Sequence, residues 1–438
     1  MSRRHSRRTA ALGPGVARAA LAGLAGLALA LALVGMSGLT MPDAAARSAS
    51  PAPERVAATA TPAPTASDVS TPEPEPPNVE FTLVAAGDVL PHSPVNTSAA
   101  TGDGYDYTPL MAGVRDYIAG ADLALCHMEV PVAPDQGRIT SYPVFGAPVQ
   151  LVRDLARTGW DGCSTASNHS VDRGFDGVVA TIDAFEAQGL GYAGTARTAD
   201  EAASVQMYEV GEAGAHVTVA HISYAYGTNG LPVSEPYSVN LFDANAADAS
   251  PIIEAAQEAR DQGADVVIAS THCCVEYRTL PTAAQESIAK QIAQSGVVDL
   301  YIGHHAHVPQ PIVKLDGGPG GDGMWVAYGL GNFLSNQSSS CCVPETSNGV
   351  LLTTTFAVTP AGDVDVGVEW TATTVDRSGG HAVYALSGTD GGLGTLSAAE
   401  VQARHARVVA AVGTEAPERS TPAEHLATYM YRVDRSGA

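Results

Sequence analysis

The fold and the candidate site both follow from the stretch Asp299-Leu-Tyr-Ile-Gly-His-His-Ala-His-Val-Pro-Gln310. Its apolar run 300–302 is typical of a short buried strand, and Gly303 ends that run. Three histidines follow within the next four residues. Alternate side chains of an extended segment point the same way, so we expect His305 and His307 to direct both imidazoles at one point. Because imidazole is a common metal ligand, this pattern favours a metal site over a solvated histidine cluster.

Length and charge narrow the class of protein. The chain has 438 residues, enough for one large α/β domain with appendages. Its formal net charge is −23, and without the first 46 residues, which hold five Arg and one Asp, it is −27. Such a surface repels nucleic acid and anionic lipid headgroups, so we expect neither as a partner. An anionic substrate needs a locally positive pocket, which bound divalent cations can supply.

Residues 1–46 have the features of an export signal. A basic head at 2–8 precedes an uninterrupted Ala/Leu/Gly-rich run at 19–34, and Ala44-Ala-Ala46 offers a small-residue cleavage site. The alternative is an uncleaved anchor helix, because the apolar stretch extended to Met41 is long enough to span a bilayer. In either case we expect an extracellular or cell-surface protein, in contact with the membrane only through this segment if it is uncleaved.

The remaining sequence divides into three parts. Residues 47–78 are rich in Pro, Ala, Thr and Ser, cannot bury a core, and are predicted to form a disordered linker. One folded domain is expected over 79–375. Residues 376–438 are expected to form a C-terminal extension with one helix and a loose final segment.

Apolar strands alternate with amphipathic helices from residue 79 to residue 303, which predicts an α/β fold with a largely buried sheet. The expected strands cover residues 79–86, 123–128, 162–166, 215–224, 264–270, 300–302, 325–328, 350–358 and 364–371. The expected helices cover residues 107–119, 149–158, 175–188, 251–262, 283–296 and 398–412.

Polar side chains able to bind metal follow the ends of successive strands, where open α/β sheets keep their ligand sites. The six candidate ligands are Asp88, Glu129, Asn168, His272, His305 and His307. Carboxylates mixed with imidazoles suit divalent Mn, Fe or Zn better than Ca or Mg. This number of ligands fits two ions bridged by Glu129, which together would activate a water and a phosphoryl oxygen. His92 is a weaker candidate that we interpret as a solvated loop residue, and His221 is assigned to the core or its rim.

The segment Asn168-His169 with Asp172 supplies the candidate catalytic residues. His169 can act as an acid or orient a phosphate oxygen, with Asp172 behind it. The plainer interpretation is a turn in which Ser170 or Asp172 caps the following helix, and the two interpretations are compatible.

Taken in order, several motifs resemble the CapA family of poly-γ-glutamate capsule-biosynthesis proteins, part of the calcineurin-like metallophosphatase superfamily. The motifs, within roughly residues 80–335, are Gly87-Asp88, Glu129, Asn168-His169 with Asp172 and Gly174, His272 with Glu276-Tyr277, Gly303-His-His-Ala-His307, and Gly331-Asn332-Phe333. The resemblance implies a four-layer α/β/β/α sandwich with the site at the C-terminal edges of its sheets, here with an appended C-terminal helix. It also implies metal-ligand roles for the six candidates and a catalytic role for His169.

Three departures from the superfamily pattern bear on activity. Asp88 is followed by Val89 and Leu90 instead of the pattern x-His, so one ligand is missing. Glu129 stands where phosphatases commonly have Asp, and Cys273-Cys274 replace Trp-Gly after the histidine. The first two departures are shared with CapA proteins generally.

Two function classes therefore stay open. One is a metal-dependent hydrolase or transferase of capsule biosynthesis at the cell surface, acting on a phosphoester or a γ-glutamyl polymer. The other is a non-catalytic surface module that binds or tethers an anionic polymer. The ligand set favours the enzyme, because a structural metal site closes its shell with four ligands and needs no catalytic histidine.

The six cysteines are even in number, and export permits disulfides. The resemblance places the pair 273/274 and the pair 341/342 at the rim of the same site, so we predict at least one bridge between the two pairs. Thiolate ligation of a metal is the alternative, and a bridge within either pair is disfavoured because it is strained. Cys126 and Cys163 lie in expected strands and are predicted to be free, buried thiols.

Overall fold

A computed structural model describes residues 77–134, 137–212 and 214–435. The expected export signal and nearly all of the expected linker lie outside the described residues. Within the described ranges, every helix is too short or too polar to cross a bilayer.

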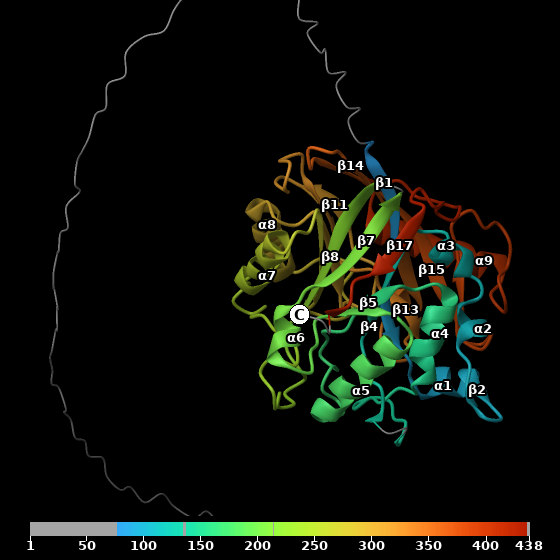
Figure 1. Cartoon of the computed structure of the whole chain (residues 1–438). Coiled ribbons are helices and arrows are strands. Elements are labelled where there is room, and N and C mark those ends of the chain that lie inside the picture. Colours follow the sequence, from blue (N-terminus) through green and yellow to red (C-terminus); the bar gives the residue numbers. More distant parts are fainter. Residues whose placement is uncertain (1–76, 135–136, 213, 436–438) are drawn as a thin grey trace, which may run out of the picture. The chain divides into compact units, whose positions relative to one another are not determined.

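Two mixed β-sheets form the centre of the described part (Figure 1). The strands of the first sheet are β1 (Val79–Leu90), β4 (Leu123–Met128), β5 (Gly162–Ser164), β6 (Gly191–Ala193), β13 (Asn332–Ser335), β14 (Asn348–Val358), β15 (Val364–Asp376) and β16 (Ala382–Ala385). Their order is β16-β15-β14-β1-β4-β5-β6, and β13 pairs with β1. The strands of the second sheet are β7 (Gln206–Glu212), β8 (Ala215–Ala225), β9 (Val266–His272), β10 (Leu300–His304), β11 (Ile312–Leu315), β12 (Met324–Ala327) and β17 (Tyr429–Arg432). Their order is β11-β12-β10-β9-β8-β7-β17.

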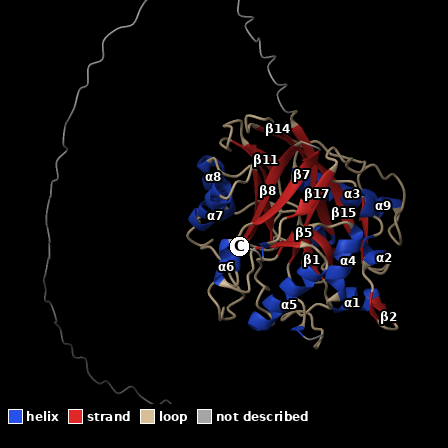
Figure 2. Cartoon of the chain, viewed as in Figure 1, coloured by secondary structure: helices blue, strands red, loops and turns tan. Residues whose placement is uncertain are grey.

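Helices lie on both sides of the stacked strands (Figure 2). They are α1 (Ser93–Ala99), α2 (Thr108–Met111), α3 (Arg115–Ala119), α4 (Gln150–Thr158), α5 (Gly174–Ala187), α6 (Ala199–Ala203), α7 (Ser250–Asp261), α8 (Ala283–Ser295) and α9 (Ala398–Val412). A short hairpin of β2 (Ala100–Thr101) and β3 (Gly104–Tyr105) and a 3-10 turn at Pro344–Ser347 complete the elements.

The alternation of side chains along β1 shows how the layers are held together. Phe81 and Leu83 pack in the core between the two sheets, whereas Val84 and Ala86 face the opposite way, into the core shared with α4 and α5. A third core joins the second sheet to α7 and α8. The expected α/β/β/α sandwich is therefore confirmed.

The appended C-terminal helix is also present. Val401 and Val408 of α9 enter the core between the sheets, and the helix contacts β14 and β15. The final segment was expected to be loose, but it is held in place. β17 pairs antiparallel with β7 as the last strand of the second sheet, and the buried guanidinium of Arg435 donates to the carbonyls of Tyr192, Glu201 and Ser204.

One expected helix is broken. The segment 107–119 forms α2 and α3 with a break at Gly113. A side chain there would meet the Val383 carbonyl oxygen at 2.5 Å, so the close approach of this backbone to β16 interrupts the helix.

The predicted free thiols of Cys126 and Cys163 form a disulfide instead. The two residues are direct partners on the neighbouring parallel strands β4 and β5, with Cα atoms 4.3 Å apart. The prediction was wrong because strand pairing, which brings residues 37 positions apart face to face, cannot be read from either strand alone.

Parallel pairing carries the candidate site residues to one edge. β1, β4 and β5 run parallel in the first sheet, and β8, β9 and β10 run parallel in the second. In register, Asp88 is opposite His127 on one side and Asn332 on the other, while His272 is opposite His304. The carboxyl ends of both sheets thus meet at the candidate site.

Replacing Gly87 with Ala should destabilise the protein by about 1–3 kcal/mol, because the new Cβ would lie 1.9 Å from the Gly331 carbonyl oxygen. That carbonyl accepts the Asp88 backbone N–H at 2.9 Å, so the clash would also displace a candidate ligand. Denaturant unfolding measures the loss. Gly102→Ala is the matched control, since nothing lies within 4 Å of its Cβ position. Equal stabilities of the two variants would contradict the prediction.

Candidate metal centre

All six predicted ligands come together in the structure, and all six are buried. Asp88 lies on β1, and His272 ends β9. The others follow strand ends: Glu129 after β4, Asn168 after β5, and His305 and His307 after β10.

Asp88 is surrounded by imidazoles. Its Oδ2 lies 2.9 Å from His307 Nδ1, and its Oδ1 lies 3.5 Å from His304 Nδ1 and 3.9 Å from His127 Nε2. Burial by itself would raise the pKa of Asp88, but His304 and His307 together hold that pKa well below its usual range. The neighbouring imidazoles therefore favour the carboxylate form of this buried acid.

Glu129 lies between two groups of histidines. Its Oε1 is 3.6 Å from His307 Nε2 and 3.8 Å from His272 Nε2. Burial raises the pKa of Glu129 well above its ordinary value, and neither of its carboxyl oxygens accepts a hydrogen bond from the described part of the chain. A buried carboxylate that accepts no hydrogen bonds costs free energy. A neighbouring cation would stabilise the charged form of Glu129.

The donor atoms form overlapping sets whose members lie within 4.8 Å of one another. The sets are Asp88/His127/His304, Asp88/Glu129/His307, Glu129/His272/His305 and Glu276/His305/His307. The Asn168 Oδ1 atom, 3.0 Å from His272 Nε2, adds an amide oxygen to the third set. These carboxylate, amide and imidazole donors fit divalent Mn, Fe or Zn, and the orphaned carboxyl of Glu129 is what a bound cation would satisfy.

The expected reason for the convergence of His305 and His307 was wrong. β10 ends at His304, and both residues lie in a bend with positive φ angles of 80° and 56° instead of in an extended segment. Such backbone costs on the order of 1–3 kcal/mol and clusters at functional sites. The two ring centroids are 5.9 Å apart, and one nitrogen of each ring lies within 4.8 Å of the other in the set with Glu276.

Four contributors were missed from sequence, namely His127, His304, Glu276 and Asn332. His127, on β4, stacks on His304 with centroids 4.1 Å apart, and both reach Asp88. His127 precedes Glu129 by two residues, a spacing that puts both on the same face of a strand, so the signal was present. Asn332 Oδ1 lies 3.2 Å from His307 Nδ1, and the Asn332 amide donates to the His307 carbonyl oxygen, which fixes that residue.

The candidate catalytic pair is in contact. His169 Nδ1 and Asp172 Oδ2 are 2.7 Å apart, and the same carboxyl oxygen accepts the Phe145 backbone N–H at 2.6 Å. This arrangement orients the imidazole through Nδ1 and leaves Nε2 as the nitrogen that can meet a substrate. Helix capping is wrong, because α5 has Arg173 at its N-cap and no side-chain cap bond.

His221 and His92 lie outside the sets of donor atoms. His221 is a core residue, as predicted, with Nε2 2.9 Å from Ser270 Oγ. His92 is half-buried instead of solvated, with Nδ1 3.0 Å from the Leu90 carbonyl oxygen and its ring against Phe145. Burial lowers the pKa of His92 to about 4.

Two cavities open beside the donors. The larger, of about 560 Å³, includes Asn168 and His305 in its lining, and the smaller, of about 380 Å³, includes His307. Both are lined by Tyr142, His169 and Glu276, so the cavities adjoin around the candidate catalytic histidine. No Lys or Arg is among the described residues that line them.

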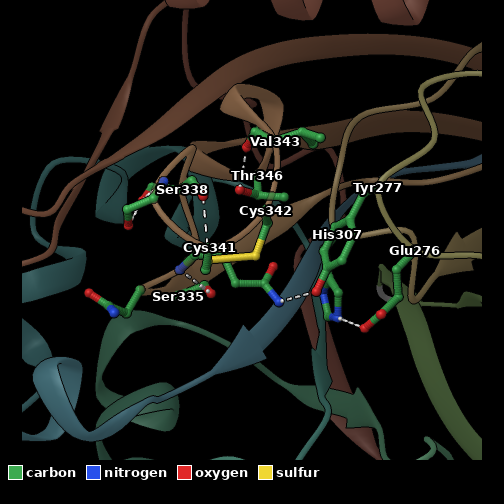
Figure 3. Close-up of a disulfide and its surroundings, with 12 residues drawn as sticks. Glu276, Tyr277, His307, Ser335, Ser338, Cys341, Cys342, Val343 and Thr346 are labelled. Carbon is green, nitrogen blue, oxygen red and sulfur yellow. Dashed lines mark hydrogen bonds and ion pairs between the residues drawn. A yellow bond between two sulfur atoms is a disulfide. The ribbon is translucent and has the colours of Figure 1, made fainter. Parts of the chain in front are cut away.

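The predicted bridge between the two cysteine pairs is wrong, because each pair closes on itself: Cys273 with Cys274, and Cys341 with Cys342. Cys274 lines the larger cavity, whereas Cys341 and Cys342 line the smaller one. Figure 3 shows Tyr277 and His307 beside the Cys341–Cys342 disulfide, with Glu276 beyond them. The two pairs therefore border different cavities.

Buried carboxylates and imidazoles gathered at the edge of an α/β/β/α sandwich, next to two cavities, are typical of a metal-binding protein. The profile of the family described as "Bacterial capsule synthesis protein PGA_cap" matches residues 82–337, more than half of the chain. This chain belongs to that family. The resemblance to the CapA family, drawn from the motifs, is thereby confirmed.

Two curated relatives are similar to the chain. It is 26% identical over 267 residues to "Capsule biosynthesis protein CapA" of Bacillus anthracis, covering 59% of this chain and 61% of the relative. It is 26% identical over 189 residues to "PGA biosynthesis protein CapA" of Bacillus subtilis (strain 168), covering 43% of this chain and 45% of the relative. The chain thus spans less than two thirds of the length of either protein. A solved calcineurin-like phosphoesterase, YfkN from Bacillus subtilis, aligns over 67% of this chain and 91% of its own at 14% identity, with a TM-score of 0.34.

Proposed function

We propose that this protein is a metal-dependent hydrolase or transferase of capsule or poly-γ-glutamate biosynthesis, acting on a phosphoester or a γ-glutamyl polymer. The observation that carries the proposal is the His169–Asp172 pair at the junction of two cavities, one lined by His305 and the other by His307. A purely structural metal site would close its ligand shell and would not place an oriented imidazole beside it.

The residues divide into three tasks. Asp88, Glu129 and His307 would hold one ion, and Glu129, Asn168, His272 and His305 a second, with Glu129 shared. Divalent ions held there would polarise a substrate oxygen and lower the pKa of a bound water. His169 would donate a proton from Nε2 to the leaving group, and Asp172 would keep Nδ1 protonated and the ring in place.

We also propose that the folded part acts outside the cytoplasm. The basic head and apolar run of residues 1–46 support export, and the three disulfides of the described part are typical of an oxidising compartment. At the cell surface, the protein would meet capsule polymer where it is assembled or attached.

The proposal is tested by loading the purified protein with Mn²⁺, Fe²⁺ or Zn²⁺ in turn and screening phosphoesters and γ-glutamyl peptides. We expect turnover on one substrate class that a chelator abolishes and one of the metals restores. Tight binding of poly-γ-glutamate without turnover of any substrate would support the other function class, a non-catalytic binding module.

A further inference from the structure

A separate polar cavity of about 340 Å³ lies on the other side of the loop that carries Cys341 and Cys342. Arg377, Arg404 and Arg407 line it, together with serines that include Ser338 and Ser340. We call this the arginine pocket. Three guanidinium groups gathered in one cavity stand out in a chain whose formal net charge is −23.

Two of these arginines are held in place by hydrogen bonds, and one of the two by neutral acceptors alone. Arg377 donates from Nε to Asn336 Oδ1 at 3.1 Å and from Nη1 to Ser338 Oγ at 2.6 Å, and both acceptors are neutral. Arg404 pairs with Glu400 at 2.8 Å and donates from Nη1 to the Val375 carbonyl oxygen at 3.0 Å. These bonds fix both guanidinium groups, and because Glu400 also lines the pocket, Arg377 is the one of the two that faces the cavity without a carboxylate partner among the described residues.

The third arginine has an unsatisfied donor. Arg407 Nε is shielded from solvent and finds no acceptor within the described part of the chain. Because Nε has almost no accessible surface, an anion in the pocket would be bound by the terminal nitrogens of Arg407. Asp376 also lines the pocket, and its oxygens accept from the neutral donors Gly379 N, Thr395 N and Thr395 Oγ1, so it keeps its negative charge. With Glu400, the lining therefore holds two carboxylates beside three guanidinium groups, and one positive charge is in excess.

One loop separates the arginine pocket from the candidate metal centre. Asn336, Cys341 and Cys342 line the 380 Å³ cavity next to His307, whereas Ser338 and Ser340 line the arginine pocket. In Figure 3 the disulfide lies between Ser338 and His307, and Cys341 N donates to the Ser338 carbonyl oxygen at 3.1 Å. Asn336 and Ser340 are four residues apart, so they lie at most about 14 Å from each other.

We propose that the arginine pocket binds an oxyanion, namely a carboxylate or phosphate group carried by the same polymer whose reacting bond lies at the metal centre. The planar guanidinium fork suits both anions. The cavities beside the metal donors are lined by no described Lys or Arg, so the pocket supplies cationic surface that they lack. This inference takes the identity of the polymer from the proposed function, but it does not require that the protein catalyses a reaction.

The test uses the full chain after metal removal by a chelator, so that neither bound metal nor turnover contributes. Binding of a γ-glutamate oligomer and, separately, of inorganic phosphate is measured at low salt for wild type, Arg377→Gln and Arg407→Gln. We expect the oligomer to bind about tenfold more weakly to each variant, because each loses hydrogen bonds to a charged group. Arg157→Gln, which removes a 59% exposed arginine on α4, should bind as wild type does.

The outcomes separate the alternatives. Unchanged oligomer affinity in both pocket variants, or an equal loss in Arg157→Gln, would overturn the proposal. Binding of phosphate without the oligomer would overturn the assignment to a polymer. Thermal unfolding checks that each variant folds. If Arg407→Gln fails to fold, Arg377→Gln alone still tests the proposal. An intact oligomer response in a protein without any turnover would support the pocket while refuting the proposed catalysis.

Discussion

Changing His305 and His307 together to Ala should leave the purified protein with less than about a tenth of the metal that wild type retains. His305 belongs to a donor set with Glu129 and His272, and His307 to one with Asp88 and Glu129, so the double change removes a ligand from each set. Loss of a residue that only hydrogen-bonds to a metal ligand already lowers metal affinity by about 10–100-fold. Elemental analysis after dialysis measures the metal content.

Stability should fall together with the metal. A ligand present at 100 times its dissociation constant stabilises the folded state by about 2.7 kcal/mol, and the double variant should lose this contribution. Chelator should therefore lower the unfolding midpoint of wild type and have little effect on the variant. His216→Ala, at an exposed position on β8, is the control and should behave as wild type does. Equal metal content in wild type and the double variant would refute the site.

His169→Ala should reduce turnover by about 10²–10⁴-fold while the metal content stays near that of wild type. The magnitude is that of general acid–base catalysis by a positioned side chain. His169 belongs to none of the sets of donor atoms within the described residues, and its Nδ1 contacts Asp172 instead. Turnover is measured on the substrate class found by the screen, beside metal analysis of the same samples.

Two companion variants sharpen this result. Asp172→Asn should also lower turnover, because it removes the carboxylate that orients the ring, and should leave the metal in place. His405→Ala removes a histidine of α9 that pairs with Glu418 and should have no effect on turnover. If His169→Ala loses metal along with activity, His169 is a ligand and its assignment to proton transfer is wrong.

The sequence pattern predicted an α/β fold with its site residues at strand ends, because both depend on local patterns, whereas the four layers were implied by the family resemblance. Apolar runs ended by Gly or polar residues located β1, β4, β9 and β10, and parallel strands bring their carboxyl ends to one edge. The missed features depend on pairing between distant segments. The Cys126–Cys163 disulfide needs the register of two strands, and β17 needs the free edge of β7.

The details of the candidate site depend on conformations that periodicity does not report. Positive φ angles at His305 and His307 direct their rings, and no alternation rule predicts them. The contact of His127 with Asp88 was in principle visible as a histidine two positions before Glu129, on the same strand face. The roles of the individual ligands and of His169 stay predictions until metal and turnover are measured.

The pairing of β17 with β7 has a consequence for the order in which the second sheet is completed. Residues 429–432 close an edge formed by residues 206–212, so that edge stays open until more than two hundred further residues have been delivered. An unpaired edge strand is a template for association with other chains. During folding, the second sheet would therefore depend on a late segment to cover β7, and the interval before that segment is available is when a chaperone would matter most.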